Sequence, residues 1–203
     1  DLRRIQSAGK HLLELINDIL DLSKIEAGKM GLSLEQFDVR TMIGELIDTL
    51  RPLVQKNNNT LIVRCDESVR TMYGDLTKTR QILLNLLSNA TKFTREGTIA
   101  VDVSPCTLAE VEGVEFSVRD TGVGMTADQT HEVFHPFTQA DVTTTRKYGG
   151  TGLGLALVSR FCEMLGGSVS LESRPDEGSH FVVFLPLHAS DMPVDSMTPA
   201  AVA

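Results

Sequence analysis

A run of glycines near residue 150 constrains the fold of this chain more than any other sequence feature. The run comprises Gly149-Gly150-Thr151-Gly152-Leu153-Gly154 and leads directly into a helical pattern of apolar residues. Backbone N–H groups at such a helix start, together with the positive end of the helix dipole, favour a bound phosphate. The run lacks the Gly-Lys-Ser/Thr of a P-loop, and a polar loop precedes it where a dinucleotide fingerprint needs a strand. We therefore expect a glycine-rich phosphate loop of another class.

Length and charge restrict the class of protein. The 203 residues suit one domain with an additional segment, because a domain takes about 150 residues. The 19 basic and 27 acidic residues give a net charge of −8, which argues against nucleic acid and anionic membrane surfaces as general partners. No apolar run approaches the roughly 18 residues of a membrane span, so we expect no membrane contact from this segment. Any anionic ligand must be held by local positive charge.

The first 22 residues have the pattern of an amphipathic helix. Their apolar residues recur at three-four spacing and form a stripe too broad to stay in water: Ile5, Ala8, Leu12, Leu15, Ile19 and Leu22, widened by Leu13, Ile16 and Leu20. One half of a helical hairpin that dimerises into a bundle explains this stripe best, and packing on the helix's own domain is the alternative. The sequence starts inside this helix without a signal peptide or initiator Met, so we expect it to be part of a longer protein.

The rest of the chain alternates between helical and strand patterns. The periodicity and the capping residues, including Asp75 as an N-cap, predict helices at 39–54, 76–92 and 153–165. Alternation of apolar and polar residues predicts strands at 32–37, 60–65, 98–103, 114–119, 168–173 and 179–187. We therefore divide the chain into a helical segment (1–29), a linker with the first strand (30–38), one α/β domain (39–187), and a linker or disordered tail (188–203).

A polar cluster interrupts the otherwise apolar helix predicted at 76–92. Asn85 and Asn89 stand four residues apart and therefore share one helix face. The amide oxygen of Asn89 suits Mg²⁺, which takes its other ligands from water and substrate phosphates. Lys92 is placed to meet a phosphate as a point charge. The alternative is that the two Asn side chains are capped or bonded to each other within a core, because buried amides need partners.

A second polar site follows the strand predicted at 114–119. The sequence Asp120-Thr121-Gly122-Val123-Gly124-Met125 places a carboxylate at the strand end. There it can accept a hydrogen bond from an exocyclic amine, while glycines let a flat ring approach the backbone. These are the properties of a surface that binds an adenine ring, although Asp-x-Gly is also a common turn. Arg146 and Lys147, in a polar loop at 138–150, supply positive charge for a polyphosphate.

Five motifs in this order resemble the ATP-binding catalytic domain of sensor histidine kinases, in the superfamily that also holds gyrase, heat-shock chaperone and mismatch-repair ATPases. The motifs are Asn85…Asn89, Asp120-x-Gly-x-Gly124, Phe134-His-Pro-Phe137, Gly150-Thr-Gly-Leu-Gly154 and Gly178-Ser179. The resemblance covers residues 32–187. Residues 2–29, through the motif at 16–28, are similar to the second helix of that family's dimerisation and phosphoacceptor domain, and residues 137–141 are of a kind common in hybrid kinases.

The resemblance implies an α/β two-layer sandwich in which a mixed sheet is backed by three helices and ATP lies under a lid formed by residues 138–150. It implies that Asn89 coordinates Mg²⁺ and that Asp120 binds the adenine amine. It also implies a lid hinge at Phe134 and Phe137, for which core packing is the alternative. The ATP-binding residues that it implies are Asn85, Asn89, Lys92, Asp120, Gly122, Gly124, Met125, Arg146, Lys147, Gly150, Thr151, Gly152, Leu153 and Gly154.

The resemblance further implies an enzyme, a protein histidine kinase that transfers the γ-phosphoryl group of ATP to a histidine for relay to a response-regulator receiver domain. The accepting histidine is expected on a helix outside this segment, because His11 lacks the adjacent acidic residue and the proline of an acceptor motif. The segment is therefore not expected to autophosphorylate alone. Homodimerisation through the helical hairpin and a cytoplasmic location, for a parent that can be membrane-anchored, follow from the same resemblance.

The residue at position 85 helps to distinguish a kinase from a related ATPase. In the related ATPases a glutamate at this place activates water, whereas the amide of Asn85 cannot take a proton. ATP hydrolysis is therefore expected to be slow. The alternative functions are a related ATPase, and a pseudokinase that binds nucleotide and dimerises without phosphoryl transfer.

Overall fold

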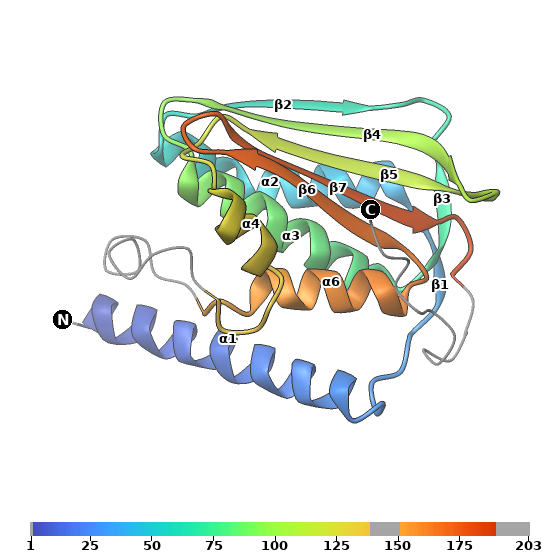
Figure 1. Ribbon diagram of the computed structural model, residues 1–203, viewed down its shortest axis with the longest axis horizontal. Coiled ribbons are helices and arrows are strands. Elements are labelled where there is room, and N and C mark those ends of the chain that lie inside the picture. Colours follow the sequence, from blue (N-terminus) through green and yellow to red (C-terminus); the bar gives the residue numbers. More distant parts are fainter. Residues whose placement is uncertain (1, 139–150, 190–203) are drawn as a thin grey trace.

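The computed structural model describes residues 2–138 and 151–189 and places them in a two-layer body with one long helix alongside (Figure 1). The described helices are α1 (Leu2–Glu26), α2 (Val39–Lys56), α3 (Leu76–Phe93), α4 (Ala127–Glu132) and α6 (Gly154–Met164). The strands are β1 (Glu35–Asp38), β2 (Thr60–Cys65), β3 (Thr71–Gly74), β4 (Thr98–Leu108), β5 (Val111–Asp120), β6 (Ser168–Arg174) and β7 (Gly178–Pro186). The body comprises the described residues from β1 onward.

A five-stranded mixed sheet forms one layer of the body. Its strand order is β2-β4-β5-β7-β6, with β2 and β4 parallel and the other neighbours antiparallel. Helices α2, α3 and α6 cover one face of this sheet (Figure 1), and the apolar side chains between the two layers form the core. The predicted α/β sandwich, with three helices behind a mixed sheet, is confirmed.

Local sequence accounts for α3, which packs between α2 and α6. The Asp75 side chain accepts a hydrogen bond from the Lys78 N–H at the helix start, as expected for an N-cap. Apolar residues at three-four spacing then face the sheet, and each of them is almost fully buried: Ile82, Leu83, Leu86 and Leu87. Each such side chain contributes about 1.5–3 kcal/mol of burial free energy, so the helix predicted at 76–92 forms with nearly the expected bounds.

Strands β4 and β5 are longer than predicted and form one hairpin. β4 runs on to Leu108 and β5 begins at Val111, so only Ala109 and Glu110 connect them. Both connecting residues have positive φ, 48° and 67°, which is the backbone of a tight primed turn usually occupied by Asn and Gly. Because the turn contains neither residue, the sequence pattern did not reveal the full length of the hairpin.

Two short elements, β3 and α4, were not expected from the sequence. β3 pairs with β1 in a separate two-stranded antiparallel sheet and has too few residues to show a strand alternation. α4 is a short helix held by a capping box between Thr126 and Gln129. The first strand also differs from the prediction at 32–37: β1 begins at Glu35, while Leu32 and Leu34 pack against the core outside the strand.

The chain after β7 adds to the small sheet. The Tyr73 N–H donates to the Leu187 carbonyl, and the Tyr73 carbonyl accepts from the Ala189 N–H, each at 2.8 Å. Ala189 is buried. The first residues of the predicted tail at 188–203 are thus attached to β3, and residues 190–203 lie outside the described residues.

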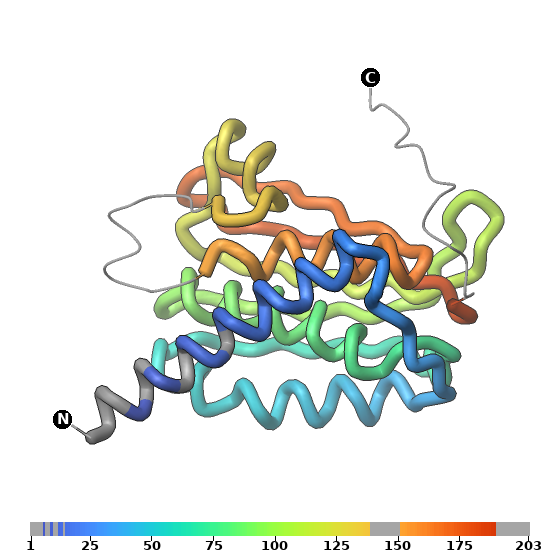
Figure 2. Tube along the Cα trace, turned by 90° about the horizontal axis from the view of Figure 1, so that it is seen from below, coloured from blue at the N-terminus to red at the C-terminus, as the bar shows by residue number. Residues whose placement is uncertain are grey.

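Helix α1 lies against the body without being enclosed by it. Figure 2 shows it crossing α6 diagonally. Leu22 is buried in this contact region, among the α1 side chains that the structure describes. The predicted amphipathic pattern is confirmed as a helix, yet five large apolar side chains remain at least 42% exposed: Leu12, Leu13, Ile16, Ile19 and Leu20. Within the described parts of the chain, no helix combines the length and the apolarity that a bilayer crossing requires.

Candidate functional site

The polar face of α3 meets the start of α6. The Asn85 Nδ2 group donates a hydrogen bond to the Gly154 carbonyl at 3.2 Å, although 69 residues separate the two positions. This bond brings the polar cluster of α3 and the predicted glycine run together. Asn85 is half-buried, and its partner in this bond is the backbone of the glycine run and not Asn89.

Asn89 lies one turn further along the same face of α3 and is half-buried. Its amide oxygen is a hard ligand of the kind that Mg²⁺ accepts. Among the described residues, no group of three or more His, Cys, Asp or Glu side chains is gathered to hold a metal ion. The single amide oxygen of Asn89 fits a magnesium ion that obtains most of its ligands from water and from nucleotide phosphates.

Lys92, which the sequence predicts to meet a phosphate, lies in the last turn of α3. Burial lowers the pKa of its ammonium group. The Nζ atom stands 4.6 Å from the centre of the neighbouring Phe93 ring, close enough for a cation–π contact. The Phe93 ring therefore stabilises the ammonium charge of Lys92 at the end of the helix.

Asp120 is the last residue of β5 and is only 6% exposed. Its Oδ1 atom accepts hydrogen bonds from the Gly122 N–H at 2.8 Å and from the Thr94 hydroxyl at 3.4 Å. Burial raises the pKa of this carboxyl above its ordinary value, and the hydrogen bonds from Gly122, Thr94 and the Ser179 backbone oppose that rise. The result is a buried acceptor whose orientation is fixed from three sides.

The glycines after Asp120 are required by close packing of the backbone. A Cβ atom on Gly122 would lie 2.6 Å from the Phe93 carbonyl oxygen and 2.8 Å from Asp120 Oδ1. Gly124 has φ of +64°, and a Cβ there would collide with the Arg174 carbonyl. Met125 follows and packs partly buried against the core. The two glycines predicted to line the adenine site are thus required by the local packing. Their contacts with adenine stay a prediction.

The described part of the glycine run begins α6 as predicted, one residue later than the expected start at 153. Thr151 Oγ1 accepts from the Leu153 N–H at 3.1 Å and donates to Asp18 Oδ2 of α1 at 3.4 Å. Leu153 is fully buried at the helix N-cap, which anchors the run in the core. Gly152 has φ of +70°, a left-handed conformation that glycine adopts without strain.

The two predicted hinge phenylalanines have different environments. Phe134 is half-buried and packs edge-to-face on Phe181, with ring centres 6.4 Å apart, as the core-packing alternative requires. Phe137 is 65% exposed, and its N–H donates to the Gly152 carbonyl at 3.0 Å. This bond therefore joins the residues that flank the predicted lid on either side. Arg146, Lys147 and Gly150 lie outside the described residues, so their roles stay predictions.

Sequence reasoning missed two asparagines that hold the end of α3, next to the Thr94 hydroxyl that bonds to Asp120. Asn59 Nδ2 donates to the Thr94 carbonyl at 2.9 Å, and Asn59 Oδ1 accepts from the Gly97 N–H at 3.1 Å. Asn57 Nδ2 donates to the Thr91 carbonyl at 2.7 Å. The bonds to Thr91 and Thr94 satisfy carbonyls at the end of α3 that the helix itself leaves open. The run Asn57-Asn58-Asn59 was the sequence signal that could have revealed them, since asparagine side chains often bond the open backbone groups at a helix end.

Comparisons with known proteins agree on one family. The family model described as "Histidine kinase-, DNA gyrase B-, and HSP90-like ATPase" matches residues 74–189. The circadian input-output histidine kinase CikA of Synechococcus elongatus is 39% identical over 197 residues, which cover 96% of this chain and 26% of that protein. This chain therefore spans about a quarter of the length of that curated relative.

Two solved structures have the same fold. The structure of full-length ShkA in complex with AMPPNP superposes with a TM-score of 0.78 at 31% identity, over 92% of this chain and 38% of that chain. The histidine kinase ThkA, in a complex with the response regulator protein TrrA, superposes with a TM-score of 0.69 over 91% of this chain and 50% of that chain. Because ThkA is 21% identical, that likeness bears on the fold alone.

Proposed function

Since this chain belongs to the Histidine kinase-, DNA gyrase B-, and HSP90-like ATPase family, we propose that it binds ATP and is the catalytic part of a sensor histidine kinase. The hydrogen bond between Asn85 and Gly154 carries this proposal, because it joins the proposed metal-binding face of α3 to the proposed phosphate loop. Relatives named as histidine kinases and the AMPPNP complex of ShkA support the choice of nucleotide and of enzyme class.

In the proposed complex, the adenine end lies at β5 and the phosphates lie at α6. Asp120 accepts the hydrogen bond of the adenine amine, between Gly122 and Gly124, with Met125 beside the ring. The phosphates lie against the residues that end the lid and begin α6. The residues assigned to the phosphates are Asn85, Lys92, Arg146, Lys147, Gly150, Thr151, Gly152, Leu153 and Gly154. Asn89 holds Mg²⁺, which neutralises phosphate charge when bound.

The proposed reaction moves the γ-phosphoryl group of ATP to a ring nitrogen of a histidine outside this sequence. A nitrogen–phosphorus bond forms as the bond to the β-phosphate oxygen breaks, and ADP leaves. A neutral imidazole is already a nucleophile, so this chain's residues position the phosphoryl group and its charge without acting as a base. Asn85 is consistent with this role, because its amide cannot deprotonate water.

The proposed partners are a receiver domain of a response regulator and a second copy of this protein. The similarity to histidine kinases such as CikA supports the first. The exposed stripe of α1, which includes Leu13, Ile16 and Leu20, supports a homodimer through a helical hairpin, since large apolar side chains at helical spacing favour a bundle. A cytoplasmic location, with a parent that can be membrane-anchored, completes the proposal.

Calorimetric titration of this chain with ATP, with and without Mg²⁺, tests the proposal. Asp120→Asn should weaken binding by more than about tenfold, because a lost hydrogen bond to a buried charged group costs about 1.5–3 kcal/mol. Asn89→Ala should remove only the part of the affinity that depends on Mg²⁺. Asp48→Asn, on the exposed face of α2, is the matched control and should bind as the wild type does.

Hydrolysis of ATP by the same samples separates the kinase from the alternatives. Turnover should stay far below about 1 s⁻¹, the lower range of enzyme rates. Faster hydrolysis would instead identify an ATPase. Failure of folded wild-type chain to bind ATP would contradict the proposed function altogether.

A further inference from the structure

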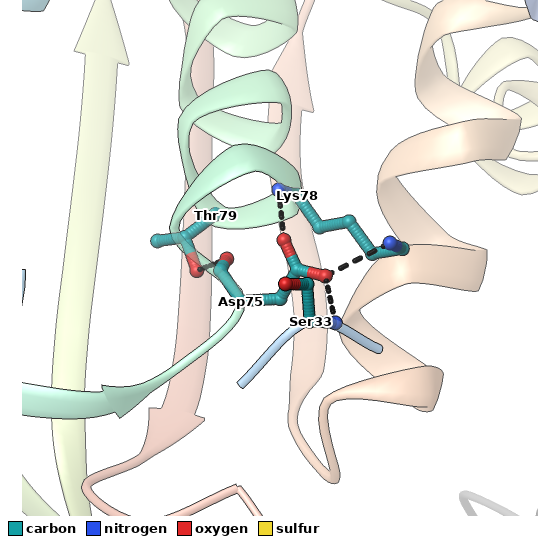
Figure 3. A network of polar contacts seen from close by, with 4 residues as sticks. All are labelled: Ser33, Asp75, Lys78 and Thr79. Atoms are coloured by element: carbon teal, nitrogen blue, oxygen red, sulfur yellow. Dashed lines mark hydrogen bonds and ion pairs between the residues drawn. The ribbon is translucent and has the colours of Figure 1, made fainter. Parts of the chain in front are cut away.

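Asp75, at the corner between β3 and α3, is a buried carboxylate outside the proposed ATP site. It is 1% exposed and belongs to the network in Figure 3. Burial raises the pKa of Asp75, but the N–H groups of Ser33 and Lys78 and the Lys78 ammonium outweigh it, so the pKa lies below its ordinary value. The carboxylate is therefore held ionised by specific partners.

The two oxygens of Asp75 have different tasks. Oδ1 accepts from the Lys78 N–H at 3.0 Å and caps α3. Oδ2 accepts from the Ser33 N–H at 2.8 Å and from the Lys78 ammonium at 2.9 Å. The Asp75 carbonyl, in addition, accepts from the Thr79 hydroxyl at 2.8 Å. One side chain thus holds both the helix start and a residue 42 positions away.

That distant residue, Ser33, lies in the linker between α1 and β1. α3, on the other side of the contact, carries Asn85, Asn89 and Lys92 in its later turns. The bond between Ser33 and Asp75 therefore connects the linker of α1 to the helix with the proposed metal and phosphate residues. α1 is attached to the site at a second point, through the bond between Asp18 and Thr151.

We propose that Asp75 is a positioning residue for phosphoryl transfer, whose Oδ2 bond to the Ser33 N–H fixes the linker, and with it α1, relative to α3. This inference rests on the proposed function, because it assigns the bond to the transfer step and not to ATP binding. The cap through Oδ1 is independent of the linker, so loss of the Ser33 bond leaves α3 and the ATP site intact.

The test removes the linker N–H without touching Asp75. Ser33→Pro deletes the donor, while Ser33→Ala keeps it and is the matched control. Gly31→Pro controls for the stiffness of proline, because a Cβ at Gly31 touches nothing within 4 Å. In this chain, amide hydrogen exchange of residues 27–32 should accelerate in Ser33→Pro alone, while the affinity for ATP stays within about twofold in all three variants.

In the full-length protein with its acceptor helix, Ser33→Pro should lower kcat for autophosphorylation by about 10- to 100-fold, the cost of a small misplacement, with KM for ATP unchanged. Asp75→Ser, which still caps a helix but is too short to reach Ser33, should produce the same split. Equal exchange or equal kcat in Ser33→Pro and Ser33→Ala overturns the inference, as does a loss of ATP affinity in Ser33→Pro. Wild-type chain that binds no ATP contradicts the proposed function instead, and the exchange comparison still decides whether Ser33 fixes the linker.

Discussion

Helices α1 and α3 share a pattern of apolar residues but have opposite environments. Both carry leucine and isoleucine at three-four spacing. In α3 this stripe is enclosed by the sheet and by α2 and α6, and Leu83 and Leu86 are fully buried. In α1 the corresponding stripe is mostly exposed, with Leu13 at 61%. The spacing of apolar residues therefore determines that a helix has a face to bury, while the surrounding chain determines whether that face is covered.

The largest expected difference between the two helices is in the cost of a truncated leucine. Leu83→Ala should lower the free energy of unfolding by about 2–5 kcal/mol, because it leaves a cavity in a closed core. Leu13→Ala, the same change on α1, should cost less than about 0.5 kcal/mol. Urea unfolding of the dilute monomer measures both. Similar losses for the two variants would mean that α1 is buried against something in solution.

A smaller difference is expected between a buried and an exposed carboxylate. Because burial raises the pKa of Asp120, the ionised group costs stability above that pKa, and the cost disappears as the pH falls towards about 3.9, its unfolded value. Asp120→Asn should therefore stabilise the body at neutral pH, and its advantage over the wild type should shrink on acidification.

Thermal unfolding between neutral and acidic pH follows this change. Glu26→Gln, which removes a carboxylate at the exposed end of α1, is the control variant against which the Asp120→Asn profile is compared. An Asp120→Asn advantage that grows as the pH falls would contradict the burial argument, because it would require a lowered pKa.

The smallest effect is expected from Gly9→Ala in α1. A Cβ at Gly9 meets nothing within 4 Å, and alanine favours the interior of a helix over glycine by about 0.5–1 kcal/mol. Helical content by circular dichroism should rise, while the unfolding free energy of the body stays the same. If the unfolding free energy of the body rises by the full amount of about 0.5–1 kcal/mol, α1 and the body unfold together. The two regions would then differ in the exposure of their side chains and not in stability.

Local patterns predicted the main elements of the fold, and contacts distant in sequence account for what was missed. The bounds of α3 follow from the Asp75 cap and the apolar spacing, which both lie within a few residues. β3 depends on pairing with β1 and on the bonds of Tyr73 to Leu187 and Ala189. Those partners are not visible in a window around β3, so its four residues carry too little signal.

The candidate site divides in the same way. Residue types and spacing identified Asn85, Asp120 and the glycine run, and the structure joins Asn85 to Gly154. They did not identify Thr94, because its tie to Asp120 spans 26 residues and its tie to Asn59 spans 35. A hydroxyl that steadies a carboxylate in this way follows only from the three-dimensional arrangement. The roles of these residues toward ATP stay predictions until binding is measured.

The bond between the Phe137 N–H and the Gly152 carbonyl has a consequence for how this family can vary. It closes the base of the segment at 139–150, so the body fixes the distance between the two ends of that segment whatever its sequence. Doubling the length of a loop closed in this way costs only about 0.6 kcal/mol of chain entropy. A longer or shorter sequence between Phe137 and Gly152 should therefore cost the fold little, as long as this bond is kept.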